Sequence, residues 1–428
     1  MRLALSPRDR GVAVDADVAA GAAILSVPSR LALQVNSASQ CPRWCESEAW
    51  DAAKWDARLA MMLLREDADA KTDLGPWLAM LPREFGMPIL WPDAETTLKT
   101  AIGYPSLAKA VALQRREWDA ARQRAPGSPS QERWDWAMCV VRSRTFSGPY
   151  AGGTFIGALA QLFGASTVAL AYALIVGGAG AADQALDGFL FAVVFVLSNE
   201  FVFGPRLSKA RRHVLCPWID LVNHDGQQGG SDVAYEYFQD AFACRLDVDG
   251  GAVKRGQQAL ISYGPRTNDV LLQYYGFVED GNVHDTYAMD QEALILALNE
   301  IEALPATALE ALKTEGLIQP AAPLALTQDG ADALALRLSR LLRHPALAKA
   351  ADSGRAPLSD ANAEADALSA LAAVAEAKLA QLPLPEAAAA AAPSHPIEAS
   401  GLLAALVKEK RRVLRLSADA LTAQAGAV

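Results

Sequence analysis

The chain has 428 residues, of which 52% are hydrophobic and 21% are charged, a composition typical of a folded globular protein. This length is sufficient for two to three domains with a large core. The formal net charge of −10 argues against a nucleic-acid-binding protein, in which a basic face would be expected.

The cysteines do not form a metal-binding pattern. The sequence contains five, at positions 41, 45, 139, 216 and 244. Cys41 and Cys45 are the only close pair, and no second pair completes a four-ligand zinc site. We therefore expect free thiols in a reducing compartment and no metal ion. The first ten residues are short and mixed, and they do not have the pattern of a targeting peptide.

The N-terminal third predicts two short strands followed by helices. Residues 11–14 and 24–28 are apolar runs separated by a glycine-containing turn, which favours two antiparallel strands. From residue 45 to residue 145 the apolar residues recur at helical spacing, with prolines and glycines between the segments. The last of these predicted helices ends near Arg144. We expect the tryptophans of this region to lie in the core.

Residues 147–212 form an unusual apolar insertion. No charged residue occurs between positions 145 and 182, and residues 154–178 are long enough to span a hydrocarbon core. A shorter apolar run follows at 188–199, basic residues flank the pair, and two aspartates lie in the turn between the runs. This pattern favours a membrane-associated hairpin through residues 154–199. The alternatives are a buried helical pair packed on the core and a contact face for a partner.

Three short polar motifs lie between residues 215 and 277. Asn223 and His224 close one apolar run, and Tyr263 belongs to the second motif, Ile-Ser-Tyr-Gly. The third motif, Tyr-Tyr-Gly-Phe, contains Tyr275 and is preceded by Asn268. Between them, residues 234–238 and 241–248 predict a β-hairpin. After residue 285 alanine and leucine recur at helical period, so we expect helices from residue 286 to residue 428.

The order of these motifs resembles the SET-domain methyltransferases of the Rubisco large-subunit lysine methyltransferase type. Several motifs occur in the order of the family and at nearly its spacing. The resemblance implies an α+β fold, with a β-rich SET domain at residues 1–285 that has a knot-like closure and a helical insertion at 45–145. It also implies an all-α substrate-binding domain at residues 286–428. The insertion at 147–212 departs from the family, in which a short loop occupies this place.

The resemblance also implies a site for S-adenosylmethionine. In the family, cofactor and peptide bind on opposite faces and are joined by a narrow channel, where catalysis is mostly orientation and desolvation. The matching catalytic residue is Tyr263. The matching cofactor-binding residues are Gly11, Arg144, Asn223, His224, Asn268 and Tyr275. The alternatives are structural ones, namely a hairpin glycine, a surface arginine, a histidine with a structural role and a core tyrosine.

The implied function is S-adenosylmethionine-dependent protein-lysine N-methylation of a non-histone protein. The alternatives are protein-histidine N-methylation, which one branch of the family performs, and a SET-like scaffold that has lost turnover. A third alternative is an integral membrane protein whose soluble part is regulatory. We expect a protein substrate as partner, no nucleic acid, a monomer, and a location in the plastid stroma, on the stromal face of a membrane, or in the cytoplasm.

Overall fold

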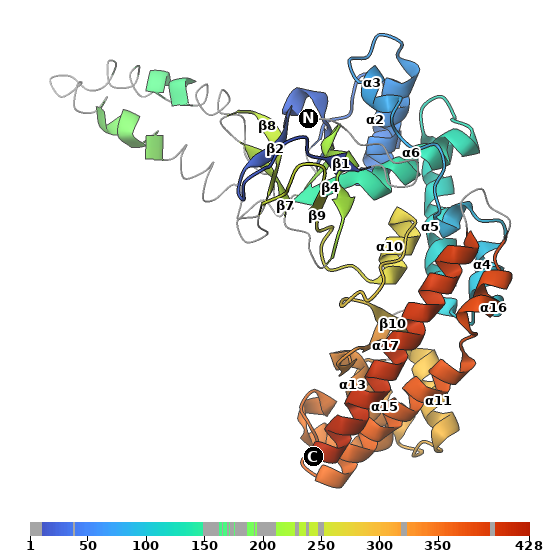
Figure 1. Ribbon diagram of the computed structural model, residues 1–428. Coiled ribbons are helices and arrows are strands. Elements are labelled where there is room, and N and C mark those ends of the chain that lie inside the picture. Colours follow the sequence, from blue (N-terminus) through green and yellow to red (C-terminus); the bar gives the residue numbers. More distant parts are fainter. Residues whose placement is uncertain are drawn as a thin grey trace. The chain divides into compact units, whose positions relative to one another are not determined.

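The computed structural model describes residues 11–36, 39–148, 211–226, 231–236, 239–246, 252–317, 323–393 and 399–428, together with isolated positions between 162 and 194. The chain forms two compact units (Figure 1). The first unit takes its residues from Met1–Arg83 and Ala120–Gly264, and the second from Glu84–Asp119 and Pro265–Val428.

The first unit is built on three small sheets, each with three strands among the described residues. In spatial order the first sheet contains β1 (Val12–Ala13), β9 (Gln258–Ile261) and β6 (Asn223–His224). The second contains β2 (Ala23–Pro28), β8 (Ala241–Leu246) and β7 (Ser231–Glu236). The third contains β3 (Leu33–Val35), β5 (Arg212–Leu215) and β4 (Thr145–Gly148). All neighbouring strands are antiparallel except β6 and β9, which are parallel.

The core of the first unit lies between these sheets. The central strand β8 is buried except at Arg245, because it has a strand on each side and apolar neighbours on its faces. Phe242 and Cys244 of this strand are fully buried, as are Val12 and Ala259 of the first sheet. Tyr263 packs against the same cluster. The first sheet is therefore fixed to the core through one of its faces.

Helices surround the sheets in the first unit. Their bounds are Ser47–Ala52 (α1), Trp55–Ala68 (α2), Gly75–Leu78 (α3) and Gln131–Arg144 (α6), with 3-10 helices η1 (Ser29–Leu31) and η6 (Ile219–Leu221). Helix α2 packs on α6, where Arg142 forms an ion pair with Asp56 at 3.2 Å. The tryptophans predicted for the core are largely buried, and Trp50, Trp77 and Trp134 are almost completely inaccessible.

The second unit is mainly helical. Its helices are α4 (Ala94–Thr96), α10 (Asn268–Tyr275), α11 (Gln291–Ile301), α12 (Ala308–Thr314), α13 (Ala333–Arg343), α14 (Pro345–Ala350), α15 (Ala361–Gln381), α16 (Pro385–Ala390) and α17 (Ala399–Ala427). It also contains the short helices η2 (Pro88–Leu90), η3 (Thr97–Ala101) and η7 (Asp352–Gly354). Helix α5 (Pro105–Arg124) begins in this unit and ends in the first.

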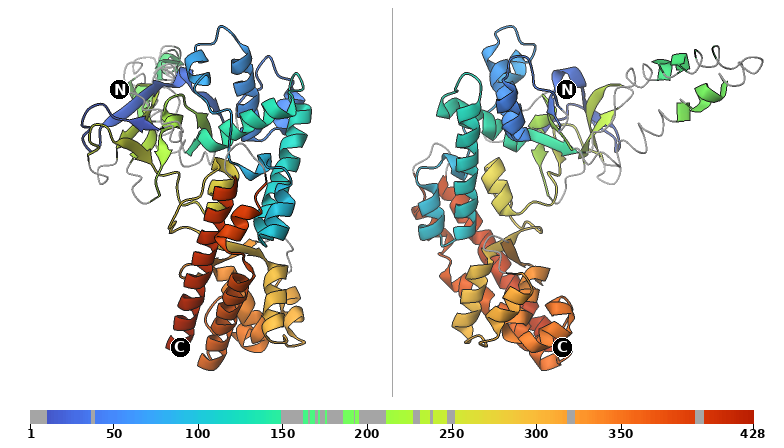
Figure 2. Two further views of the ribbon diagram at one scale, coloured as in Figure 1. Left: turned by 45° about the vertical axis from the view of Figure 1, so that its right-hand side comes forward. Right: turned by 180° about the vertical axis from the view of Figure 1, so that it is seen from behind.

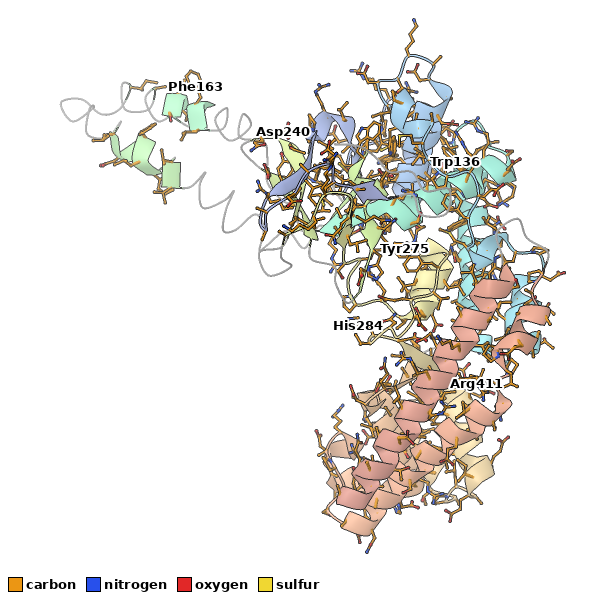
Figure 3. The ribbon with its side chains drawn as sticks, viewed as in Figure 1. Trp136, Phe163, Asp240, Tyr275, His284 and Arg411 are labelled. Carbon is orange, nitrogen blue, oxygen red and sulfur yellow. The ribbon has the colours of Figure 1, made fainter. Side chains whose placement is uncertain are left out.

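The two longest helices of the second unit lie side by side. Helix α17 runs along α15 in both views of Figure 2 and contacts it over much of its length. Arg411 of α17, labelled in Figure 3, donates hydrogen bonds to the carbonyl groups of Leu379 and Leu382. These carbonyls lie at the end of α15, where helix carbonyls have no partner within the helix. The arginine therefore fixes the end of α15 to α17.

The prediction of an all-α region after residue 285 is wrong in one respect. The second unit contains a three-stranded antiparallel sheet of β10 (Thr286–Asp290), β11 (Pro323–Thr327) and β12 (Gly330–Ala331). Strands β10 and β11 have alternately buried and half-buried residues, the period-two pattern of a sheet with one face on a core. Strands of five residues are too short to interrupt the helical period of the composition around them.

The strands near the N-terminus form where they were predicted, but they do not pair with each other. Strand β1 pairs with β9, and β2 pairs with β8, so each finds its partner more than 200 residues later in the chain. The hairpin of β7 and β8 is confirmed, with its turn at Gln239 and Asp240. The knot-like closure stays a prediction.

Most of the apolar insertion predicted as a membrane hairpin, residues 154–199, lies outside the described residues. Among the residues that the structure describes, no helix is both long enough and apolar enough to cross a bilayer. The domain boundary predicted at residue 285 also stays a prediction. The compact units divide elsewhere, at Gly264 and Pro265, and the second unit includes residues 84–119.

Candidate active site

The sheet of β1, β9 and β6 brings together residues from three distant parts of the chain. Strand β9 lies in the centre, with Val12 of β1 opposite Ala259 on one side. On the other side Asn223 lies opposite Leu260, and His224 lies opposite Ile261 in parallel register. Side chains alternate between the two faces of a sheet, so this register determines which residues share a face.

Asn223 and Gln258 lie on the solvent side of this sheet, beside the buried Gly11. The Asn223 Nδ2 amide donates a hydrogen bond of 3.1 Å to Oε1 of Gln258. A Cβ atom added to Gly11 would lie 2.5 Å from Gln258 Oε1 and 2.8 Å from Asn223 Nδ2. The main chain at Gly11 is therefore in close contact with two amide side chains, an approach that a missing Cβ makes possible.

His224 and Tyr263 share the opposite face. The main-chain N–H of Tyr263 donates a hydrogen bond of 3.0 Å to Nδ1 of His224. The two rings stack with their centroids 4.8 Å apart and their planes inclined by 22°. The Tyr263 hydroxyl donates a hydrogen bond of 3.0 Å to the carbonyl oxygen of Val222. Tyr263 is thus held at its main chain, its ring and its hydroxyl.

Arg144 ends helix α6 and forms an ion pair with a buried aspartate. Its Nη1 lies 2.8 Å from the carbonyl oxygen of Asp220 and 3.2 Å from the carboxylate oxygen Oδ2. Trp77 donates a hydrogen bond of 3.0 Å to the other carboxylate oxygen. Burial raises the pKa of the Asp220 carboxyl, and the Arg144 guanidinium and the Trp77 hydrogen bond oppose this shift without cancelling it.

This ion pair braces the segment that carries Asn223 and His224. Asp220 belongs to η6, which leads directly into β6. The residue before η6, Trp218, has a φ of 71° and a ψ of −40°, a backbone conformation that is costly for a bulky side chain. Backbone strain of this kind gathers at functional sites, where the surrounding structure holds it in place. Arg144 Nε is buried and has no hydrogen-bond partner among the residues that the structure describes.

The two remaining predicted residues belong to the second unit. Asn268 is fully buried at the start of α10, where its amide donates to Asp285 and to the Glu279 carbonyl and accepts from the Glu279 N–H. Tyr275, labelled in Figure 3, ends α10, and its ring lies edge-to-face with that of Phe277. The roles predicted for Asn268 and Tyr275 in cofactor binding stay predictions. The structure shows that Asn268 forms hydrogen bonds within the second unit, with Glu279 and Asp285.

Sequence reasoning did not single out Gln258 or Asp220. Gln258 is an exposed polar residue at the start of a strand, and only the register of β9 with β6 places it beside Asn223. Asp220 is the single charged residue in the apolar run at 217–222. A single acidic residue in an apolar run is a usable signal, because a buried carboxylate needs a partner and Arg144 was already a candidate.

The site can be compared with those of known proteins through the fold alone. No protein-family model matches this sequence, and no curated protein matches it. Solved structures do match. The SET domain of LSMT bound to lysine and AdoHcy is 16% identical, covers 97% of this chain and 84% of its own, and has a TM-score of 0.55.

Two further solved structures give the same result. Rubisco LSMT bound to sinefungin and monomethyllysine is 16% identical, with 97% of this chain and 85% of that chain covered and a TM-score of 0.56. Rubisco LSMT bound to AdoMet is also 16% identical, with 97% and 84% covered and a TM-score of 0.55. The chain therefore has the fold of these SET-domain structures.

Proposed function

We propose that this chain is an S-adenosylmethionine-dependent protein methyltransferase whose target is a lysine side chain of a non-histone protein. One observation carries the proposal: a single small sheet bears the Gly11, Asn223 and Gln258 group on one face and the tightly held Tyr263 on the other. Such an arrangement suits a cofactor and a protein substrate that meet from opposite sides. The likeness to SET-domain structures bound to AdoMet and to lysine supports it.

The groups on the solvent side fit the amino-acid end of the cofactor. Gly11 has no Cβ, and the Asn223 amide beside it supplies both a donor and an acceptor. Arg144 adds a buried Nε–H that has no partner in the described part of the chain, and such a donor suits an anionic group. When bound, S-adenosylmethionine supplies an electrophilic methyl group on its sulfonium sulfur.

Tyr263 provides an acceptor for the amine of the substrate. Its hydroxyl proton is donated to the Val222 carbonyl, so its oxygen can only accept further hydrogen bonds. A substrate amine that donates an N–H to this oxygen would have the lone pair of its nitrogen held in a defined direction. An in-line displacement needs this alignment. The lone pair of the neutral amine forms the new N–C bond while the C–S bond breaks, and the surplus amine proton passes to water.

Labelled-methyl transfer into a total protein extract tests this proposal. We expect the purified chain to label a protein, Asn223→Ala to abolish saturable cofactor binding, and Tyr263→Phe to slow labelling about a hundredfold, the order of loss that misorientation causes. Tyr235→Phe is the matched control, because it removes a hydroxyl that bonds Asp240 elsewhere in the first unit. No labelling and no cofactor binding by the unaltered chain would favour the silent scaffold.

Mass spectrometry of the labelled protein would then identify the modified side chain. Methyl-lysine would support the proposal, and methyl-histidine would replace it with the alternative activity. Size-exclusion chromatography with light scattering tests the proposed monomer, and organelle fractionation tests the proposed plastid or cytoplasmic location.

We also propose that residues 154–199 attach the chain to a lipid surface. The support is the long uncharged run and the exposure of large apolar side chains at the described positions of this segment. Phe163, shown in Figure 3, Ile175 and Phe191 are 77%, 83% and 72% exposed. Exposed apolar surface of this kind marks a region that contacts a membrane or a partner.

A further inference from the structure

The imidazole ring of His224 contacts Tyr263 in two independent ways. Nδ1 accepts the hydrogen bond from the Tyr263 N–H at 3.0 Å, and the ring stacks on the tyrosine ring at 4.8 Å. The first contact fixes the main chain of Tyr263, and the second fixes the rotation of its ring. Both are contacts of the side chain, so they do not depend on any use of the His224 main chain in cofactor binding.

The shorter of two contacts assigns the tautomer of the imidazole. Nδ1 lies 3.0 Å from the Tyr263 main-chain nitrogen and 3.4 Å from the Ile261 carbonyl oxygen, so we assign Nδ1 as the acceptor from Tyr263, which places the proton of the neutral ring on Nε2. A side chain at position 224 must therefore offer an acceptor at this place. A phenyl ring would preserve stacking but would leave the Tyr263 N–H without this partner, and burial of an unsatisfied N–H is costly.

The three residues 222–224 connect the two faces of the sheet. Val222 accepts the hydroxyl of Tyr263 through its carbonyl, and His224 accepts the N–H of the same tyrosine. Asn223, between them, directs its amide to Gln258 on the other face. One short segment therefore holds both ends of Tyr263 while its middle residue belongs to the group beside Gly11.

We propose that His224 is a positioning residue, which sets the place and direction of the Tyr263 hydroxyl through its ring. This inference rests on the proposed methyltransferase function, because the Tyr263 hydroxyl has a role only in that reaction. It assigns the His224 side chain to Tyr263 and not to the cofactor. His224 acts on the alignment of the substrate amine. Its loss should lower turnover and leave the dissociation constant of S-adenosylmethionine unchanged.

Three variants separate the two contacts. His224→Phe keeps stacking and removes the acceptor, His224→Asn keeps an acceptor near the position of Nδ1 and removes the ring, and His224→Ala removes both. We expect turnover to fall about a hundredfold in the Phe and Ala variants and to recover to within about tenfold of the unaltered chain in the Asn variant. His213→Phe is the matched control, since His213 also stacks on an aromatic ring, Trp55, and bonds Ser147 in the same unit.

A double-mutant cycle tests whether His224 acts through Tyr263. In the Tyr263→Phe background there is no hydroxyl left to align, so we expect His224→Phe to reduce turnover less than about threefold further. Additive losses would overturn the proposal. Loss of S-adenosylmethionine binding in His224→Phe, measured by calorimetry, would also overturn it and make His224 a cofactor-binding residue.

Hydrogen exchange gives a readout that does not require turnover. The Tyr263 amide should exchange faster in His224→Phe than in the unaltered chain and should be protected again in His224→Asn. Equal exchange in all three proteins would contradict the inference even if the chain proves inactive. If exchange behaves as expected but no methyl transfer or cofactor binding occurs, the contact stands and the proposed function fails.

Discussion

Gly11 has a neighbourhood in which any side chain would collide with two amides. The atoms that a Cβ would meet are the ends of two flexible side chains, Gln258 and Asn223. These side chains can move aside for an alanine at little cost to the fold, but their displacement would disturb a ligand bound beside them. We expect Gly11→Ala to shift the melting temperature by less than about 2 °C, a range that corresponds to about 1 kcal/mol for a unit of roughly 200 residues. The same change should weaken S-adenosylmethionine binding at least tenfold, measured by calorimetry.

Gly75→Ala is the control for this experiment, because a Cβ at Gly75 would meet no atom within 4 Å. If Gly11→Ala binds the cofactor as tightly as the unaltered chain, the ligand does not approach this part of the main chain. If Gly75→Ala also loses S-adenosylmethionine binding, the loss in Gly11→Ala reflects a general disturbance of the fold and not a contact with the ligand.

Cys45 should be an unreactive thiol at neutral pH. Burial, assisted by the neighbouring Cys41 thiol, raises its pKa to about 11 from an ordinary value of 9.0. Only the thiolate reacts with iodoacetamide, so at pH 8 we expect labelling about a hundredfold slower than for an ordinary thiol, with the rate rising until the pH passes 11. Site-resolved mass spectrometry measures this rate, and fast labelling at pH 8 would contradict the prediction.

Helix α17 is joined to α10 and β10 of the second unit by one buried lysine. Lys410 Nζ lies 2.7 Å from the Asp285 carboxylate, 3.0 Å from that of Asp269 and 2.7 Å from the Thr286 carbonyl. Burial would lower the pKa of Lys410, but the two carboxylates outweigh burial and raise it. The stabilising effect is therefore complete below the ordinary pKa of 10.5 and is lost as the pH rises through the elevated folded-state value.

We expect Lys410→Met to lower the free energy of unfolding by about 3–5 kcal/mol, because it leaves two buried carboxylates without a counter-charge. Urea denaturation measures this loss. Lys408→Met is the control, since Lys408 lies two residues away and pairs with Asp280 at the exposed surface. A similar loss in both variants would show that the effect belongs to the helix and not to the buried cluster.

Local elements were predictable from the sequence, whereas those that depend on distant partners were not. The hairpin of β7 and β8 has its own turn, and the strand β9 follows Gly256, which has a φ of 84°. The sheet formed by β10 and β11 was missed because its strands are short and lie about 35 residues apart in a helical composition, so neither strand carries a turn signal toward the other.

The same distinction applies to the site. Asn223, His224 and Tyr263 could be named from their motifs, but the faces on which they lie follow from the parallel register of β6 with β9. A one-residue slip in register would exchange the faces. Gln258 and Asp220 became visible only when long-range pairing placed them beside Asn223 and Arg144.

The chain as a whole carries a net charge of −10 together with one long uncharged run, residues 145–182. We expect it to float with liposomes of neutral lipid, because insertion of apolar residues does not need an anionic surface. A variant lacking residues 154–199 should stay in the dense fraction and keep its cofactor binding. Failure of the unaltered chain to float would favour the alternatives, a buried helical pair or a face for a protein partner.

The pairing of β1 with β9 has a consequence for synthesis on the ribosome. Strand β1 leaves the exit tunnel first, but its partner is translated roughly 250 residues later, which takes tens of seconds at 5–20 residues per second. Throughout that interval the N-terminal strand has no edge to join, so Gly11 cannot reach Asn223. Nascent chains that stop before Gln258 should therefore fail to capture S-adenosylmethionine, and the proposed site would be completed only after β9 has been translated.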